Sequence, residues 1–178
     1  MKKKNDQNEF HSTGPWVARI GMYVAVSLIC SYIETLVPIS FGVPGIKLGL
    51  ANLTVLFVLY TMEAKDALLV SSLRIVLAGF LFGNLFSILY SLAGGLFSLL
   101  VMWLLKKTDK FGCISVSAAG GICHNIGQLL LAAAIVENYN VLFYLPVLLI
   151  AGLLTGLLIG IAAQEVLLRL GKKLKNST

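Results

Sequence analysis

Long apolar runs alternate with short polar segments along most of the chain. Roughly 20 consecutive apolar residues are enough to cross a bilayer as a helix, and the length of the chain leaves room for six such runs. The pattern predicts an all-α, polytopic membrane protein with six helices, at about 16–36, 46–62, 67–82, 85–105, 113–136 and 142–168.

Two breaks in the apolar pattern decide the helix count. Pro38 ends the first helix, and the following segment Val37–Gly45 contains two prolines and two glycines, so it is predicted to be a loop. The pair Gly83–Asn84 divides the run from Ala67 to Leu105. As a single helix this run would be roughly 58 Å long at about 1.5 Å per residue, too long for one crossing. Six helices are therefore favoured over five.

The basic residues are distributed unevenly between the two predicted sides. If the N-terminus lies inside, the outer side holds only Lys47, and Arg74 lies within the third helix. All other basic residues lie inside: Lys2, Lys3, Lys4, Arg19, Lys65, Lys106, Lys107, Lys110, Arg169, Lys172, Lys173 and Lys175. The positive-inside rule therefore predicts that both termini lie on the cytoplasmic side. The membrane is expected to be the cell membrane of a bacterium. One membrane domain, 16–170, lies between basic tails at 1–15 and 171–178.

Composition agrees with this topology. The chain has 178 residues, of which 58% are hydrophobic and 12% charged, and its mean hydropathy is +0.90. Soluble domains carry about twice that share of charge. The net charge is +6, and the basic residues lie between the apolar runs rather than on one face. This distribution argues against a nucleic-acid partner and indicates that the chain lies in the lipid bilayer. The three cysteines form no CxxC pair, so no metal site and no cofactor is expected.

Small residues recur at helical spacing in two of the predicted helices. In lipid, helices associate where small side chains let their backbones approach closely. The simpler interpretation is packing within the chain, and the alternative is docking of a partner subunit. The candidates for partner docking are Ala18, Gly21 and Ala25 on the first helix and Gly152, Gly156 and Gly160 on the last.

Polar side chains within apolar helices are costly, so they are candidates for a ligand site. These residues are Glu34, Lys47, Asn52, Arg74, Asn84, His124, Asn125 and Gln128. Arg74 stays charged, and Glu34 is its obvious acidic partner. Arg74 and Lys47 together give two cations against the one carboxylate of Glu34. This surplus of positive charge suits an anionic ligand group. For Asn125 and Gln128 alone, hydrogen bonds that lock the bundle are the preferred interpretation.

Four motifs resemble one known family. Pro44–Asn52 (PGIKLGLAN), Ser72–Ser87 (SLRIVLAGFLFGNLFS), Tyr90–Gly95 (YSLAGG) and His124–Leu129 (HNIGQL) are similar to those of the Gx transporter family, whose older name is heptaprenyl diphosphate synthase component I. That family is similar to the substrate-binding S components of energy-coupling factor (ECF) transporters. Those are six-helix bundles that capture a vitamin-like substrate outside and dock on a T component driven by two ATPases.

The resemblance implies roles at matching positions. Small residues on the first helix, here Gly21 and Ala25 with Ala18 nearby, would contact the T component. The loop Val37–Gly45 would close over the substrate. The binding cavity would open outward, with a ligand held among Glu34, Lys47, Asn52, Arg74, Asn84 and His124.

The older family name suggests an enzyme, which the residues do not support. Prenyl diphosphate synthases hold Mg²⁺ with clustered aspartates, whereas Asp6, Asp66 and Asp109 are isolated and lie outside the predicted spans. No phosphate-binding glycine-rich loop ending in Lys-Ser/Thr is present. The first hypothesis is therefore an S-component-like subunit that captures a small anionic or amphipathic compound. The second is a noncatalytic membrane scaffold for prenyl diphosphate or quinone synthesis. A proton path through His124 and Arg74 is less favoured, because no chain of carboxylates spans the bilayer.

Overall fold

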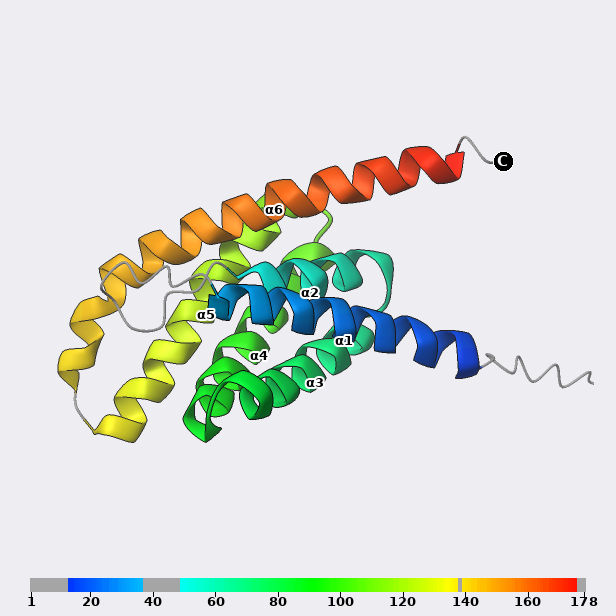
Figure 1. Cartoon of the computed structure of the whole chain (residues 1–178). Helices are drawn as coiled ribbons and strands as arrows, with labels where there is room; N and C mark the ends of the chain where they lie inside the picture. Colours follow the sequence, from blue (N-terminus) through cyan, green and yellow to red (C-terminus); the bar gives the residue numbers. More distant parts are fainter. Residues whose placement is uncertain (1–12, 37–48, 138, 176–178) are drawn as a thin grey trace, which may run out of the picture.

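The molecule is a bundle of α-helices (Figure 1). The computed structural model describes residues 13–36, 49–137 and 139–175, and all regular elements in these ranges are helical. The elements are α1 (Thr13–Leu36), α2 (Leu50–Thr61), α3 (Ala64–Phe82), α4 (Leu85–Lys107), α5 (Cys113–Val136), the 3-10 helix η1 (Tyr139–Tyr144) and α6 (Leu145–Lys175). The predicted all-α class and the six α-helices are confirmed.

Four of the helices are long and apolar enough to cross a membrane: α1, α4, α5, and α6 together with most of η1, over Asn140–Leu170. The remaining two differ from the expectation of six such spans. The apolar helix α2 has 12 residues, which reach roughly 18 Å at about 1.5 Å per residue, short of a bilayer core of about 30 Å. The 19-residue α3 contains Lys65, Asp66 and Arg74. Length and composition alone therefore define four candidate spans.

Three helix ends differ from the prediction, and local chemistry explains the first two of them. Gly49 has a φ of 75°, in the left-handed region that glycine adopts readily, and α2 begins only after it, at Leu50. Helix α3 begins earlier than predicted, because Glu63 and Asp66 form a capping box around its first turn. Helix α6 continues to Lys175, into the predicted C-terminal tail. The predicted loop at 37–45 and most of the N-terminal tail lie outside the described residues.

The helices pack in two groups of three. Helix α1 packs along α2 and α3, and α5 packs along α4 and α6, while contacts between α3 and α4 and between α2 and α6 join the groups. In Figure 1 the beginning of α1 and the end of α6 lie at the same end of the bundle. The apolar core lies toward this end, since it is formed by residues such as Ile20, Leu59, Val70 and Val116.

The glycines of α6 pack against α5 within the chain. A Cβ added at Gly156 would lie 2.7 Å from the Ser117 carbonyl oxygen, and one at Gly160 would lie 2.8 Å from Ile114 Cα. A Cβ at Gly152 would lie 2.6 Å from the Gly121 carbonyl oxygen. These glycines therefore pack helices within the chain, which was the simpler interpretation of their spacing. Because α5 covers this face of α6, the face is closed to a partner subunit.

Candidate functional site

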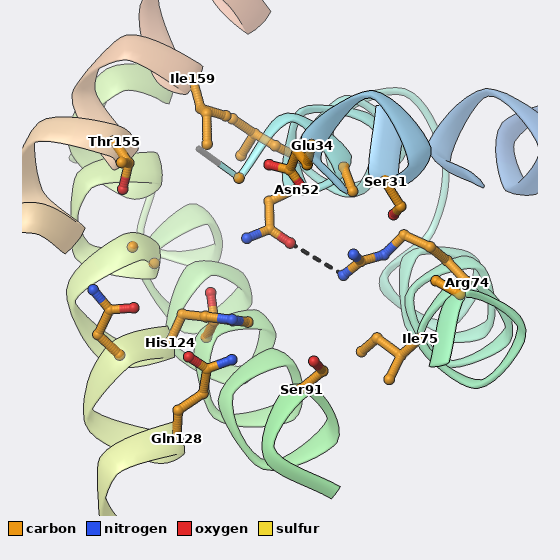
Figure 2. Close-up of a pocket in the computed structure, with 18 of the residues that line it drawn as sticks. Ser31, Glu34, Asn52, Arg74, Ile75, Ser91, His124, Gln128, Thr155 and Ile159 are labelled. Atoms are coloured by element: carbon orange, nitrogen blue, oxygen red, sulfur yellow. Dashed lines mark hydrogen bonds between the residues drawn. The ribbon is translucent and has the colours of Figure 1, made fainter. Parts of the chain in front are cut away.

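A cavity of about 220 Å³ lies among the six α-helices and adjoins the apolar core, since Leu56, Met102 and Ile159 belong to both. Figure 2 shows polar side chains from α1, α2, α3 and α5 around it. Six of the eight predicted site residues line this cavity: Glu34, Asn52, Arg74, His124, Asn125 and Gln128. The tertiary structure thus brings together positions that are up to 94 residues apart (34 to 128) in the sequence.

Arg74 is the buried cation of the cavity. Its side chain is 9% exposed and extends from α3 toward α2, where Nη2 donates a hydrogen bond to Asn52 Oδ1 at 3.2 Å. The Nε atom is buried and has no hydrogen-bond partner among the described residues. A guanidinium group has five N–H donors and stays protonated in proteins. Arg74 therefore presents charge and unused donors to the cavity.

Glu34 stabilises the start of α2. One of its carboxylate oxygens, Oε1, accepts a hydrogen bond from the Leu50 backbone N–H at 2.6 Å, at the N-terminus of the helix, where a negative charge is favourable. Its negative charge also attracts Arg74, but within the described ranges no carboxylate forms an ion pair with Arg74. The expected direct pairing of these two residues is therefore not what the structure contains.

Helix α5 supplies the opposite wall. Asn125 Nδ2 donates to the Leu148 carbonyl oxygen at 2.7 Å and ties α5 to α6, which is the bundle-locking role. His124 and Gln128 extend from the same helix (Figure 2). Gly94 of α4 makes room for both, since an added Cβ would lie 2.7 Å from Gln128 Cγ and 3.2 Å from His124 Cε1. The close approach of α4 and α5 therefore shapes this wall.

Two predicted residues are not brought to the cavity wall by the described structure. Asn84 is the N-cap of α4, where its Oδ1 accepts a hydrogen bond from the Ser87 backbone N–H at 2.8 Å, and it is not among the cavity-lining residues. Asn is a preferred N-cap because its side chain satisfies an otherwise free N–H. Lys47 lies outside the described residues.

Several hydroxyl groups of the cavity were missed by the sequence reasoning. They belong to Ser31, Ser87, Ser91, Ser98, Ser117 and Thr155. A lone serine or threonine in an apolar helix is uninformative, because its hydroxyl can bond to the carbonyl one turn back, as Thr155 does to Ala151 at 2.9 Å. Ser31 differs, since its Oγ is buried and has no hydrogen-bond partner within the described ranges. The described part of the chain contains no group of three His, Cys, Asp or Glu side chains suited to a metal ion.

Apolar helices long enough to cross a membrane, packed around a cavity with polar groups in its wall, define the class of the molecule, a multi-pass membrane protein. The model of the family described as heptaprenyl diphosphate synthase component I matches residues 23–166, and the chain belongs to that family. The matched range contains every described residue of the cavity wall. No curated protein and no solved structure matches the chain. The family resemblance inferred from the sequence motifs is thus confirmed.

Proposed function

We propose that this protein is a noncatalytic substrate-binding subunit of S-component type, which captures a small anionic or amphipathic compound from outside for an ECF importer. The observation that carries the proposal is the cavity with Arg74 in its wall, in a chain whose outside is largely apolar. A buried charge is retained in a membrane protein at considerable cost, and such residues typically mark substrate or ion sites. A cavity of this size suits a small molecule better than a polyprenyl chain.

The proposed topology has six crossings, with both termini on the cytoplasmic side and residues 16–170 as one membrane domain. The helices α2 and α3 complete the bundle by packing against α1, α4 and α6, so their shortness and charge are compatible with a position inside it. Apart from Arg74, the basic residues whose side chains are described lie toward the helix ends on the side of the apolar core: Arg19, Lys65, Lys106, Lys107, Lys110 and Arg169. This orientation would direct the cavity toward the outside.

The proposed surface for the T component lies on α1. Ala18, Gly21 and Ala25 are exposed, and a Cβ added at Gly21 would meet no atom within 4 Å. Such a face leaves room for the backbone of a partner helix to approach closely. This distinguishes it from the glycines of α6, which α5 covers.

Copurification tests the proposal. The tagged full-length protein, expressed in its own cell membrane, is expected to retain a T component and ATPase subunits in mild detergent. Gly21→Leu and Ala25→Leu are expected to release these subunits without changing the yield of the tagged chain. The matched control is Ala162→Leu, a similar change at an exposed position of α6. Retention of the same subunits by all three variants would remove α1 as the docking surface.

A second candidate function follows from the family's description. A heptaprenyl diphosphate synthase component would associate with a soluble prenyl synthase, presenting a lipid diphosphate to it at the membrane. Copurification with such a synthase, together with an increase in its activity when the two are mixed, would favour this scaffold role. Copurification with ATPases would favour transport.

A further inference from the structure

At one corner of the cavity wall, two buried polar atoms on adjacent helices find no hydrogen-bond partner among the described residues. These atoms are Arg74 Nε on α3 and Ser31 Oγ on α1. Both residues are more than nine-tenths buried, and both line the cavity. Figure 2 shows the Arg74 side chain extending into the cavity from α3, with Ser31 on the neighbouring turn of α1. A buried donor is costly unless it finds an acceptor, so this corner of the wall is suited to an acceptor group from a ligand.

Two acceptor oxygens of the cavity wall already accept hydrogen bonds from other donors. Asn52 accepts the hydrogen bond from Arg74 Nη2, and Glu34 accepts the backbone N–H of Leu50. Asn52 is neutral, so it orients the guanidinium without cancelling its charge. An acceptor for Arg74 Nε and Ser31 Oγ would therefore come from outside the described wall.

The charges of the wall limit the ligand to one negative group. Among its described residues, Arg74 contributes one permanent positive charge and Glu34 is the carboxylate. A planar guanidinium matches a carboxylate in geometry, with two parallel N–H···O bonds. A diphosphate would need several cations or a metal ion, and it would be repelled by Glu34. A single carboxylate fits this charge balance.

The α5 wall indicates the chemistry of the rest of the ligand. His124 and Gln128 of α5 lie across the cavity from Arg74 (Figure 2), and Ser91 of α4 adds a hydroxyl group to the wall. With a neutral histidine, these side chains carry no charge, and together they offer both hydrogen-bond donors and hydrogen-bond acceptors. They are suited to an uncharged group, such as an amide or a heterocyclic nitrogen.

We infer that the cavity selects a small monocarboxylate, held by Arg74 and Ser31, whose uncharged hydrogen-bonding body extends toward His124 and Gln128. This inference rests on the proposed function, in that it takes the cavity to be a ligand site. It goes further by naming the ligand class, and it excludes a prenyl diphosphate from this cavity.

Thermal unfolding of the full-length protein in detergent tests the ligand class with matched probes at equal ionic strength. Benzoate and benzamide have the same shape and differ in charge, while inorganic pyrophosphate carries more charge. Benzoate is expected to raise Tm in a saturable manner, whereas benzamide and pyrophosphate leave it unchanged. Arg74→Met is expected to abolish the rise, and Ser31→Ala to weaken the apparent affinity for benzoate at least threefold.

A second serine on α1 provides the control. Ser27 is buried one turn before Ser31, but its Oγ donates to the Ala51 carbonyl oxygen at 3.2 Å and it does not line the cavity. Ser27→Ala is therefore expected to bind benzoate as the wild type does. This pair of serine variants keeps the test decisive even where Arg74→Met fails to fold.

Each alternative result overturns a defined part of the inference. An equal rise in Tm with benzamide would show that binding in the cavity does not depend on the charge of the ligand. An Arg74-dependent rise in Tm with pyrophosphate would show that the site binds phosphate groups. Either result overturns the monocarboxylate while leaving a ligand-binding cavity. Stabilisation by none of the probes overturns the inference as well. The importer proposal fails separately, when no T component or ATPase copurifies.

Discussion

Asn52 Oδ1 on α2 accepts a hydrogen bond from Arg74 Nη2 on α3, at 3.2 Å. A neutral amide thus positions a buried cation, where a carboxylate would have neutralised it. The positive charge stays available to the cavity, at the cost of keeping a guanidinium out of water. This relationship connects the fold of the first three helices to the chemistry of the proposed ligand.

Replacing the amide by a carboxylate of the same shape tests that relationship. Asn52→Asp is expected to form an ion pair with Arg74 and to weaken benzoate binding at least tenfold, because the guanidinium charge is then already paired. The variant remains folded, with a Tm equal to or above that of the wild type. Benzoate titrations followed by thermal unfolding measure both effects. Asn84→Asp is the matched control, since Asp also caps α4 and the residue lies off the cavity wall.

Removing the charge of Glu34 is expected to act in the opposite direction. Glu34→Gln keeps an oxygen that can accept the Leu50 N–H, but it removes a negative charge from the cavity wall. A carboxylate ligand then binds about fivefold more tightly, corresponding to about 1 kcal/mol of relieved repulsion. Glu165→Gln, which disrupts an exposed pair with Arg169, leaves the affinity unchanged. Weaker benzoate binding by Glu34→Gln would mean that the carboxylate itself contacts the ligand.

The glycines of α6 and α1 are expected to respond differently to enlargement. Gly156→Leu places atoms against the backbone of Ser117 and is expected to cost about 1–3 kcal/mol or more, through separation of α5 from α6. Gly21→Leu enters open space and is expected to change stability by less than about 0.5 kcal/mol. Thermal unfolding in detergent compares the two variants. Equal destabilisation would contradict the packing described for these helices.

The beginnings of α1 and α3 are joined by one hydrogen bond. Trp16 Nε1 donates to Asp66 Oδ1 at 3.0 Å, and the other oxygen of Asp66 accepts the Glu63 backbone N–H in the α3 capping box. Asp66→Ala removes both interactions and is expected to cost about 2 kcal/mol. Asp66→Asn retains an acceptor for Trp16 and is expected to cost less.

A double-mutant cycle isolates the bond between these two helices. Trp16→Phe and Asp66→Ala share one lost interaction, so the double variant is expected to lose about 1 kcal/mol less than the sum of the single losses. Strictly additive losses would show that Trp16 and Asp66 do not stabilise each other.

The proposed topology predicts which helix ends face outside. After replacement of Cys30, Cys113 and Cys123 by serine or alanine, single cysteines are introduced at Leu85, at the beginning of α4, and at Thr108, after its end. A membrane-impermeant maleimide added to intact cells is expected to label Leu85→Cys, while Thr108→Cys is labelled only after permeabilisation. The reverse pattern would place the termini and the cavity on the opposite sides.

Much of this architecture is contained in local patterns. The helix count follows from apolar runs divided by Pro38 and by Gly83–Asn84, since proline and glycine disfavour the continuation of a helix. Polar side chains in apolar helices are energetically costly, so the sequence alone identified Arg74 and His124 as candidates for a ligand site.

The sequence by itself thus determined the helical class, the approximate helix bounds and the family. Only the tertiary structure decided which helix faces meet. It directs Glu34 to the start of α2 rather than into an ion pair with Arg74, and it turns Gly156 toward α5. It also places the hydroxyl of Ser31 beside a cavity, with no partner in the described part of the chain. The physical reason is that lipid and protein interior are equally apolar, so hydrophobic periodicity does not distinguish the inside of such a bundle from its outside.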